Sequence, residues 1–292
     1  MIFDDSDYEI LDYCPWCHSS KYEKWGALVN NFETVKCLNC ELIFIIKRLN
    51  ESGLNKYYTN YLSHTHQADI SMNKKRQRMY EIEFDLIKRF AKPTNVLDVG
   101  CSGGYFLDFF QKHGFECFGF EIGQEALEEA SKKYKVWTGN FEEISIPMHF
   151  DLIILRGVIE HIPYPKKYLK KATELINEGG LIYITSTPNA KAFCCSLFKE
   201  NWNQHAPEGH LMHMNTNHFD DFFLALGFEK INDCCLYEKS PYANVEDDIL
   251  AVAKAIDLKK KNKKINFKSP PFYGNMLSLI YKKQVPSQKE VG

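Results

Sequence analysis

Four cysteines near the start of the chain have the spacing of a metal site. They form two Cys-x-x-Cys pairs, Cys14 with Cys17 and Cys37 with Cys40, and nineteen residues separate the pairs. Each such turn can direct two thiolates at one ion, and two turns complete a tetrahedral set of sulfur ligands. We expect a closed, structural Zn²⁺ site whose binding energy helps a small module to fold. The alternative interpretation is four reduced cysteines packed in a core.

A glycine-rich turn is the second feature whose residue types suit chemistry. Residues 95–99 form a short apolar run that is typical of a buried strand, and a turn containing Gly100, Gly103 and Gly104 follows. Glycines let the backbone turn sharply and approach a ligand that a Cβ atom would obstruct. In open parallel sheets the ligand lies beyond the carboxyl ends of the strands, so this turn is placed to bind one.

The residues in and around the turn separate two classes of nucleotide ligand. A dinucleotide fingerprint starting at Gly100 would need glycine at positions 102 and 105, which are Ser102 and Tyr105. Asp98, two positions before the first glycine, suits the cationic amino group of a methionine moiety. Glu121 ends the next apolar run about twenty residues later, where a carboxylate suits two ribose hydroxyls. The pattern favours S-adenosylmethionine over a nicotinamide dinucleotide.

Strand-like and helix-like segments alternate from residue 94 onward, which predicts an α/β, Rossmann-like fold with helices on both faces of a parallel sheet. The expected strands cover 95–99, 116–120, 135–137, 150–155, 181–186, 229–238 and 275–283. The expected helices are 73–91, a segment containing Phe106 and Phe110, 124–134, 165–177, a segment from Phe219 to Leu226, and 244–264. A hairpin is expected within residues 22–36, and the helix over 165–177 is expected to end at Gly179 and Gly180.

The same patterns divide the chain into four parts. We predict a zinc-binding module over residues 1–48, a helical connector over 49–92, a catalytic domain over 93–284 and a disordered tail over 285–292. Within the domain, substrate-side insertions are expected at 188–216 and 240–272. Three tyrosines of the connector, Tyr57, Tyr58 and Tyr61, either wall an acceptor pocket or pack at a seam between parts.

Bulk composition excludes some partners. The 292 residues are 45% hydrophobic and 25% charged, and the net charge of −2 gives no overall attraction to nucleic acid or anionic membrane. No apolar run reaches the ~18–20 residues that span a bilayer. The first residues are acidic and do not form a secretory signal, so we expect a cytoplasmic protein whose remaining cysteines are reduced. The sequence does not fix an oligomeric state.

Several motifs between residues 96 and 184 carry a resemblance to a known class of enzymes. They are VLDVGCSGGYF at 96–106, GFE at 119–121, FDLIIL at 150–155, VIEHI at 158–162 and EGGLIYI at 178–184. Together they resemble the class I S-adenosylmethionine-dependent methyltransferases, in the broad family of ubiquinone-biosynthesis O-methyltransferases and many sugar and secondary-metabolite methyltransferases. A cysteine module followed by tyrosine-rich segments resembles a subgroup that methylates sugars or glycans.

This resemblance implies a seven-stranded sheet whose last strand is antiparallel. It also implies that the turn holds the methionine part of the cofactor, that Glu121 holds its ribose, and that residues after the second and third strands flank its adenine. The cofactor-binding residues implied in this way are Asp98, Gly100, Cys101, Ser102, Gly104, Glu121, Ile122, Asn140, Phe141 and Arg156.

One departure from the family pattern bears on a second metal. Metal-dependent relatives carry a glutamate three residues before the Glu160-His161 pair, where this chain has Arg156-Gly157, so the pair alone is a doubtful magnesium site. Methyl transfer to a hydroxyl needs positioning of the acceptor and removal of a proton. His161, just beyond the fourth strand, is the first candidate for the base, and His210 and His213 are its rivals.

Three functions compete at this level. The first is methyl transfer to a small molecule, above all to a hydroxyl or carbon of a sugar or nucleotide sugar. The second is methylation of RNA by an enzyme with a zinc module, against which the near-neutral charge and the lack of a broad basic stripe argue. The third is a scaffold that binds S-adenosylmethionine without turnover.

Overall fold

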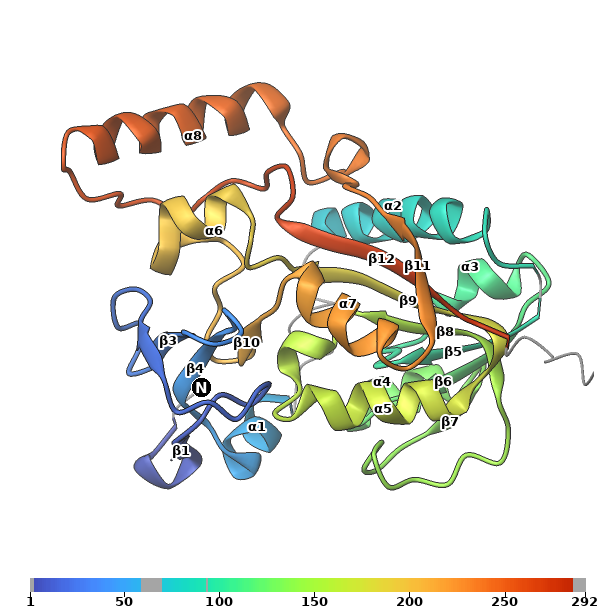
Figure 1. Cartoon of the computed structure of the whole chain (residues 1–292). Helices are drawn as coiled ribbons and strands as arrows, with labels where there is room; N and C mark the ends of the chain where they lie inside the picture. The colour runs from blue at the N-terminus through green and yellow to red at the C-terminus, as the bar shows by residue number, and fades with distance from the viewer. Residues whose placement is uncertain (1–2, 59–69, 93, 286–292) are drawn as a thin grey trace, which may run out of the picture.

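A seven-stranded sheet organises the larger part of the computed structural model, which describes residues 3–58, 70–92 and 94–285 (Figure 1). In spatial order its strands are β11 (Phe228–Asp233), β12 (Met276–Lys283), β9 (Ile176–Pro188), β8 (Phe150–Arg156), β5 (Asn95–Val99), β6 (Glu116–Phe120) and β7 (Lys135–Trp137). The pairs from β9 to β7 are parallel, and β12 runs antiparallel to both β9 and β11. The expected Rossmann-like sheet with an antiparallel last strand is confirmed.

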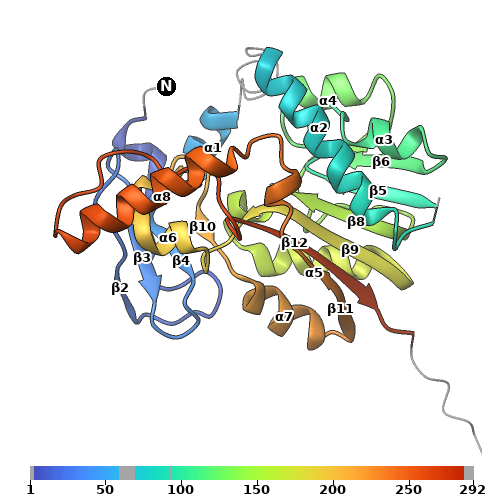
Figure 2. The ribbon, with the colours of Figure 1, turned by 90° about the horizontal axis from the view of Figure 1, so that it is seen from above.

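Helices cover both faces of this sheet because its central strands are apolar on both sides (Figure 2). One face carries α2 (Ile70–Ile87), α3 (Leu107–Gln111) and α4 (Gln124–Ala130); the other carries α5 (Pro165–Leu175) and α7 (Thr216–Leu224). Successive residues of a strand therefore point to opposite faces and belong to different apolar clusters. On β8, Ile154 belongs to the apolar cluster under α2 and α3, whereas Ile153 belongs to the cluster under α5 and α7.

Several predicted boundaries are wrong; among them, helix α4 ends at Ala130 rather than at 134, and β9 begins at Ile176 rather than at 181. Helix α5 ends at Leu175 rather than at 177, because Ile176 already pairs with Phe150 in the sheet. Gly179, with a φ of 76°, therefore does not end the helix but lies inside β9, beside an irregularity in its register. Strand β11 ends at Asp233 instead of 238, and the last long helix, α8 (Val245–Lys260), is four residues shorter than expected at its end.

A second, antiparallel sheet builds the N-terminal part. Its strands are β1 (Tyr8–Ile10), β4 (Ile43–Leu49), β3 (Glu33–Cys37) and β2 (Tyr22–Lys24), in that spatial order, and β10 (Met212–His213) also pairs with β4. The β2–β3 hairpin lies within the predicted range. Strand β10 comes from the predicted insertion at 188–216, so the small sheet is completed by a distant part of the chain (Figure 1).

Further short elements connect these units. They are α1 (Glu51–Tyr58), α6 (Phe193–Phe198) and the 3₁₀ turns η1 (Asp5–Asp7), η3 (Ile159–His161), η4 (Lys199–Asn201) and η5 (Tyr237–Lys239). Helix α8 packs on α6 through Val252 and Ala255, and its lysine-rich end complements the negative pole of the helix dipole.

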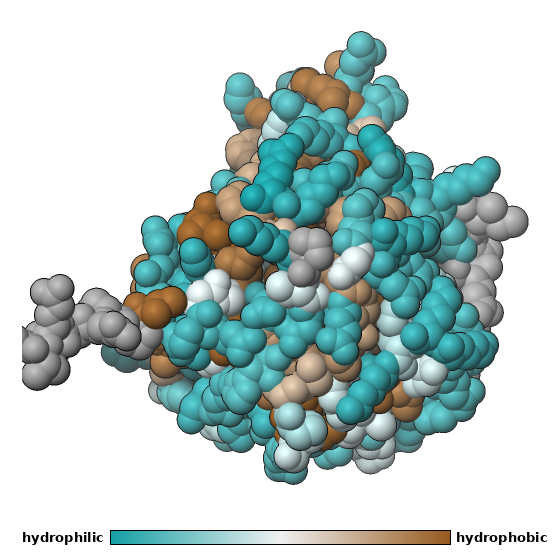
Figure 3. Space-filling model, turned by 90° about the vertical axis from the view of Figure 1, so that its right-hand side faces the viewer, coloured by the Kyte–Doolittle hydropathy of each residue, from teal (hydrophilic) through white to brown (hydrophobic). Residues whose placement is uncertain are grey.

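The surface of the described residues is largely polar on the face shown in Figure 3, where hydrophobic side chains gather in small groups. Along residues 3–58, 70–92 and 94–285, no helix combines the length and apolar character needed to cross a membrane. Residues 286–292, in the predicted tail, and Tyr61 lie outside the described part of the chain.

Candidate active site

The glycine turn leaves β5 at the carboxyl edge of the sheet. Gly100 has a φ of 77°, and a Cβ atom added there would lie 2.6 Å from Cγ2 of Val158. The N–H groups of Gly100 and Cys101 donate to the carbonyl oxygen of Phe120 at 2.7 and 3.1 Å, which ties the turn to β6. Ser102 also has a positive φ, 50°, and its Oγ is buried without a hydrogen-bond partner among the described residues. The turn thus offers backbone and one unpaired hydroxyl to a ligand.

Glu121 follows β6, and its carboxylate binds the backbone of the glycine turn that follows β5. Its Oε2 accepts a hydrogen bond from the Ser102 N–H at 2.8 Å, and its Oε1 accepts from the N–H groups of Ile122 and Gly123 at 2.8 and 2.7 Å. Burial raises the pKa of this carboxyl, and the backbone donors oppose that shift. A carboxylate accepts about four hydrogen bonds, so capacity remains for a ribose hydroxyl.

Asp98 on β5 is buried, with 2% of its surface exposed, and its Oδ1 has no hydrogen-bond partner among the described residues. Burial raises the pKa of this carboxyl to about 8, and the nearby Arg156 opposes the shift. Asp98 lines a hollow together with Gly100 and Ser102. An unpartnered buried carboxylate is costly, so a cationic ligand group in this hollow would stabilise it.

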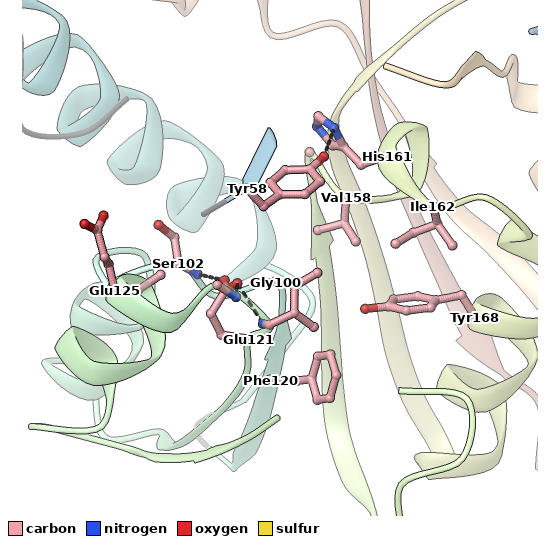
Figure 4. Close-up of a pocket in the computed structure, with 14 residues that line it drawn as sticks. Tyr58, Gly100, Ser102, Phe120, Glu121, Glu125, Val158, His161, Ile162 and Tyr168 are labelled. Carbon is pink, nitrogen blue, oxygen red and sulfur yellow. Dashed lines mark hydrogen bonds between the residues drawn. The ribbon is translucent and has the colours of Figure 1, made fainter. Parts of the chain in front are cut away.

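A second, adjoining hollow lies beside Glu121 and has an apolar, aromatic lining (Figure 4). Phe120 at the end of β6, Val158 after β8 and Tyr168 on α5 contribute to its walls. Ile122 also lines it and keeps 57% of its surface exposed. Apolar walls beside a carboxylate are suited to a flat base attached to a ribose.

Two residues that the resemblance assigned to the adenine lie away from this hollow. Phe141 is buried behind it and packs on Phe120 and Tyr168, with ring centroids 4.8 and 4.5 Å apart. Asn140 is exposed, and its Oδ1 accepts a hydrogen bond from the Glu142 N–H at 3.0 Å. Tyr168 lines the hollow but was missed by sequence reasoning, because only the packing of α5 against the sheet places it there.

His161, on the turn η3, lines both hollows. Its Nδ1 lies 2.9 Å from the Gly209 carbonyl oxygen. The same Nδ1 lies 2.9 Å from the Tyr58 hydroxyl (Figure 4). Because a carbonyl oxygen only accepts, Nδ1 carries the ring proton and Nε2 keeps its lone pair. Burial, with His210 beside it, lowers the pKa of His161 to about 3, so the ring is neutral at pH 7. Of the predicted tyrosines, Tyr58 therefore does reach the site.

Glu160 and His210 stand next to His161. One ligating atom from each of the three residues lies within 4.8 Å of the others. The Nδ1–H of His210 donates to the Gln204 carbonyl oxygen at 2.7 Å, while burial raises the pKa of Glu160 to about 8. The group could accept a cation, although Gly157 offers no further ligand.

The other histidine rival lies outside both hollows. His213 on β10 is fully buried, and its Nε2 lies 3.1 Å from Nδ1 of His205. The ring of Trp202 packs against His213 with centroids 5.0 Å apart. His213 therefore belongs to a buried cluster of rings with Trp202 and His205, and His161 and His210 remain the candidates for proton transfer.

The four paired cysteines converge as the sequence predicted. The sulfur of Cys14 lies 3.6 Å from that of Cys40, that of Cys17 lies 3.5 Å from that of Cys37, and all four are within 4.8 Å of one another. Zinc–sulfur bonds of about 2.3 Å in a tetrahedron separate sulfurs by about 3.8 Å, so the cluster fits Zn²⁺ closely.

Both cysteine turns have the same backbone geometry. In the first, the His18 N–H donates to the Cys14 carbonyl oxygen at 3.0 Å, and in the second the Glu41 N–H donates to that of Cys37 at 3.1 Å. His18 and Glu41 have φ of 59° and 63°. Two copies of one local turn facing each other form a closed set of thiolates, which supports a structural zinc site without His18 as a ligand.

The small sheet is connected to the candidate active site by hydrogen bonds through one residue. The Ile45 N–H of β4 donates to the Leu211 carbonyl oxygen at 2.9 Å, and the Leu211 N–H donates to the Glu160 carbonyl oxygen at 2.8 Å. The sheet that carries the cysteine cluster is thereby joined to the backbone beside His161 and His210.

S-adenosylmethionine fits the donor and acceptor groups of the two hollows. The unpartnered Asp98 Oδ1 would take its ammonium group, Glu121 its ribose and the apolar hollow its adenine. A Cβ atom at Gly100 would crowd Val158 at the junction of the hollows, which explains the glycine.

Comparisons with known proteins agree with this geometry. A family described as "Methyltransferase domain" matches residues 72–232, which is more than half of the chain. The chain belongs to this family, and its sheet order and cofactor turn place it among the class I S-adenosylmethionine-dependent methyltransferases.

Individual relatives and solved structures share only a modest fraction of their residues with this chain. The chain is 27% identical over 147 residues to a ubiquinone biosynthesis O-methyltransferase of Nitrosospira multiformis, covering 46% of this chain and 61% of that enzyme. The same-named enzyme of Coxiella burnetii is 31% identical over 115 residues, covering 36% and 49%. Magnesium protoporphyrin IX methyltransferase of Synechocystis, solved with bound S-adenosylhomocysteine, superimposes with a TM-score of 0.51 and 13% identity over 80% of this chain and 96% of that one.

The chain thus spans between about half and three fifths of the length of these two curated relatives. At 13% identity, the similarity to the magnesium protoporphyrin IX methyltransferase structure shows a shared fold.

Proposed function

We propose that this chain transfers the methyl group of S-adenosylmethionine to a hydroxyl or carbon of a small polar acceptor, of which sugars and nucleotide sugars are the first candidates. The cofactor supplies an electrophilic methyl group on a sulfonium. The observation that carries the proposal is the position of His161, whose neutral ring lines both the hollow of Glu121 and the hollow of Asp98.

The residues around His161 give it a defined role. The Gly209 carbonyl oxygen fixes the proton on Nδ1, so Nε2 can accept a proton from an acceptor hydroxyl. Tyr58 and His210 restrict the ring on two sides, with the His210 ring centroid 4.8 Å away. An acceptor in the hollow of Asp98 and Glu160 would then face both the base and the methyl donor.

A sugar-like acceptor is supported by polar groups in a third cavity, which adjoins the hollow of Asp98 through shared residues. Amide and hydroxyl side chains of Asn203, Gln204, Ser240 and Asn275 line it, and they suit a molecule rich in hydroxyl groups. The Asn275 Oδ1 is buried without a partner among the described residues.

Calorimetric titration with S-adenosylhomocysteine and a turnover screen with nucleotide sugars test the proposal. We expect cofactor binding by the wild-type chain and release of S-adenosylhomocysteine from S-adenosylmethionine with at least one acceptor. His161→Ala should lower turnover by roughly 10²–10⁴-fold while cofactor affinity changes little. Glu121→Ala should weaken cofactor affinity instead. No binding at millimolar ligand would refute the proposed cofactor, and full activity of His161→Ala would remove the base.

A further inference from the structure

Arg156, the last residue of β8, does not line the hollow of Glu121. It lines the hollow of Asp98 and the third cavity, which extends from there toward α2, β12 and the segment after β11. Arg76 of α2 lines the same two spaces. The sequence assigned Arg156 to the cofactor, whereas its position adjoins the space that an acceptor would occupy.

The guanidinium of Arg156 is fixed in the absence of any ligand. Its Nε donates to Oε2 of Glu83 at 2.6 Å. The rings of Tyr80 and Phe106 lie 4.6 and 5.8 Å from its Cζ, which restricts the guanidinium on its other sides. A side chain held in this way loses little rotamer entropy when it binds a further group.

Glu83 is held by three hydrogen bonds and serves as an anchor. Its side chain has no exposed surface, and its Oε1 accepts hydrogen bonds from the hydroxyls of Thr185 and Ser186 at 2.8 and 2.7 Å. Among the described residues, Glu83 is the only hydrogen-bond partner of the Arg156 guanidinium, and the bond uses Nε. Both Nη groups are therefore left for a ligand, and 20% of the Arg156 side chain remains exposed.

A purely structural ion pair explains this arrangement less well. Buried ion pairs contribute little net stability, and an apolar pair would fill the same volume. The charged side chains that line the third cavity are Arg76, Glu83 and Arg156, so the lining carries a net positive charge. An anchored arginine with two free N–H edges in a positively charged cavity is the arrangement that binds oxyanions.

We propose that the acceptor carries an oxyanion, a carboxylate or a phosphate, and that Arg156 binds it through its two Nη groups and so determines acceptor specificity. The inference rests on the proposed function, because it assigns the third cavity to the acceptor of methyl transfer. Both oxyanions present paired oxygens that a guanidinium engages in a bidentate way.

The test uses the full chain saturated with S-adenosylhomocysteine and titrated with phenyl phosphate, benzoate and neutral benzyl alcohol. We expect at least one anion to bind the wild type, and Arg156→Lys, which keeps the charge but loses the fork, to weaken it at least tenfold. Cofactor affinity should stay within twofold. The matched control is Arg78→Lys on the exposed side of α2, which should bind the anion as the wild type does. The stronger of the two anions identifies phosphate or carboxylate.

Several results would overturn the inference. They are no anion binding by the wild type, equal anion binding by Arg156→Lys, or a parallel loss of cofactor affinity, which would assign Arg156 to the cofactor's own carboxylate. The double variant Glu83→Gln with Arg156→Gln replaces the pair by two neutral amides, and it must also lose anion binding. Failure of the wild type to bind S-adenosylhomocysteine would count against the proposed function, while titration of the cofactor-free chain would still report on the anion subsite.

Discussion

The cysteine cluster and the cofactor hollows are built in opposite ways. The cluster consists of two copies of one local turn, each with its own internal hydrogen bond, and their four sulfurs lie within 4.8 Å of one another. The hollows are built from the ends of β5, β6 and β8 and from distant helices, and they contain buried carboxyls whose pKa values are raised. A site made of local turns can be recognised from the spacing of its cysteines, whereas a site made of convergent strand ends depends on packing between distant elements.

Removing one thiolate should have the largest effect. Cys37→Ala leaves three ligands, so we expect loss of bound zinc and a free energy of unfolding lower by about 4 kcal/mol or more. Because Ile45 and Glu160 are joined through Leu211, turnover should fall as well. Metal analysis and denaturant unfolding measure both effects. The exposed Cys235, changed to Ser, is the control for zinc content and unfolding, and a Cys37→Ala protein with full zinc content would contradict the assignment.

The pH dependence of cofactor affinity should report on the Asp98 carboxyl, which the cofactor's ammonium group would neutralise. With a pKa of about 8, Asp98 is protonated below that pH in the free chain, whereas a bound ammonium favours its carboxylate. Binding then releases a proton, so affinity for S-adenosylhomocysteine should rise with pH from 6 to 8, by at most about tenfold per unit. Calorimetry at three pH values measures this slope.

The slope should vanish in Asp98→Asn, which cannot release the proton. Asp85→Asn, an exposed change on α2, should keep it. A slope that persists in Asp98→Asn would assign the released proton to another group and remove the ammonium from this position.

The smallest effect should come from the turn itself. Ser102 holds a φ of 50°, which costs a non-glycine residue about 1–2 kcal/mol, and its hydroxyl is unpartnered. Ser102→Gly should leave cofactor affinity within about threefold and raise the free energy of unfolding by up to about 1 kcal/mol, since glycine's own entropy offsets part of the gain. Thermal unfolding checks this. A marked loss of cofactor affinity would show that the Ser102 hydroxyl binds the ligand.

The sequence predicted the features that depend on local patterns. It also predicted those that follow from the carboxyl ends of parallel strands lying at one edge of the sheet. It placed Asp98, Gly100 and Glu121 at one edge of the sheet and paired the four cysteines. It did not predict β10, because a two-residue strand has no periodicity to detect. Nor did it predict the contact of Glu83 with Arg156, since only the packing of α2 brings together side chains so far apart in sequence.

The pairing of β4 with β10 has a consequence for synthesis of the chain. Residues Ile43 and Phe44 begin the apolar strand β4, and their partners on one edge are His213 and Met212. At ~5–20 residues per second, that edge stays unpaired for roughly ten seconds or more after translation of β4. An uncovered apolar strand edge is a place where nascent chains associate wrongly. Zinc captured early by the cysteine cluster would hold the strand in its hairpin during this interval, so we expect the yield of folded chain to depend on metal supply.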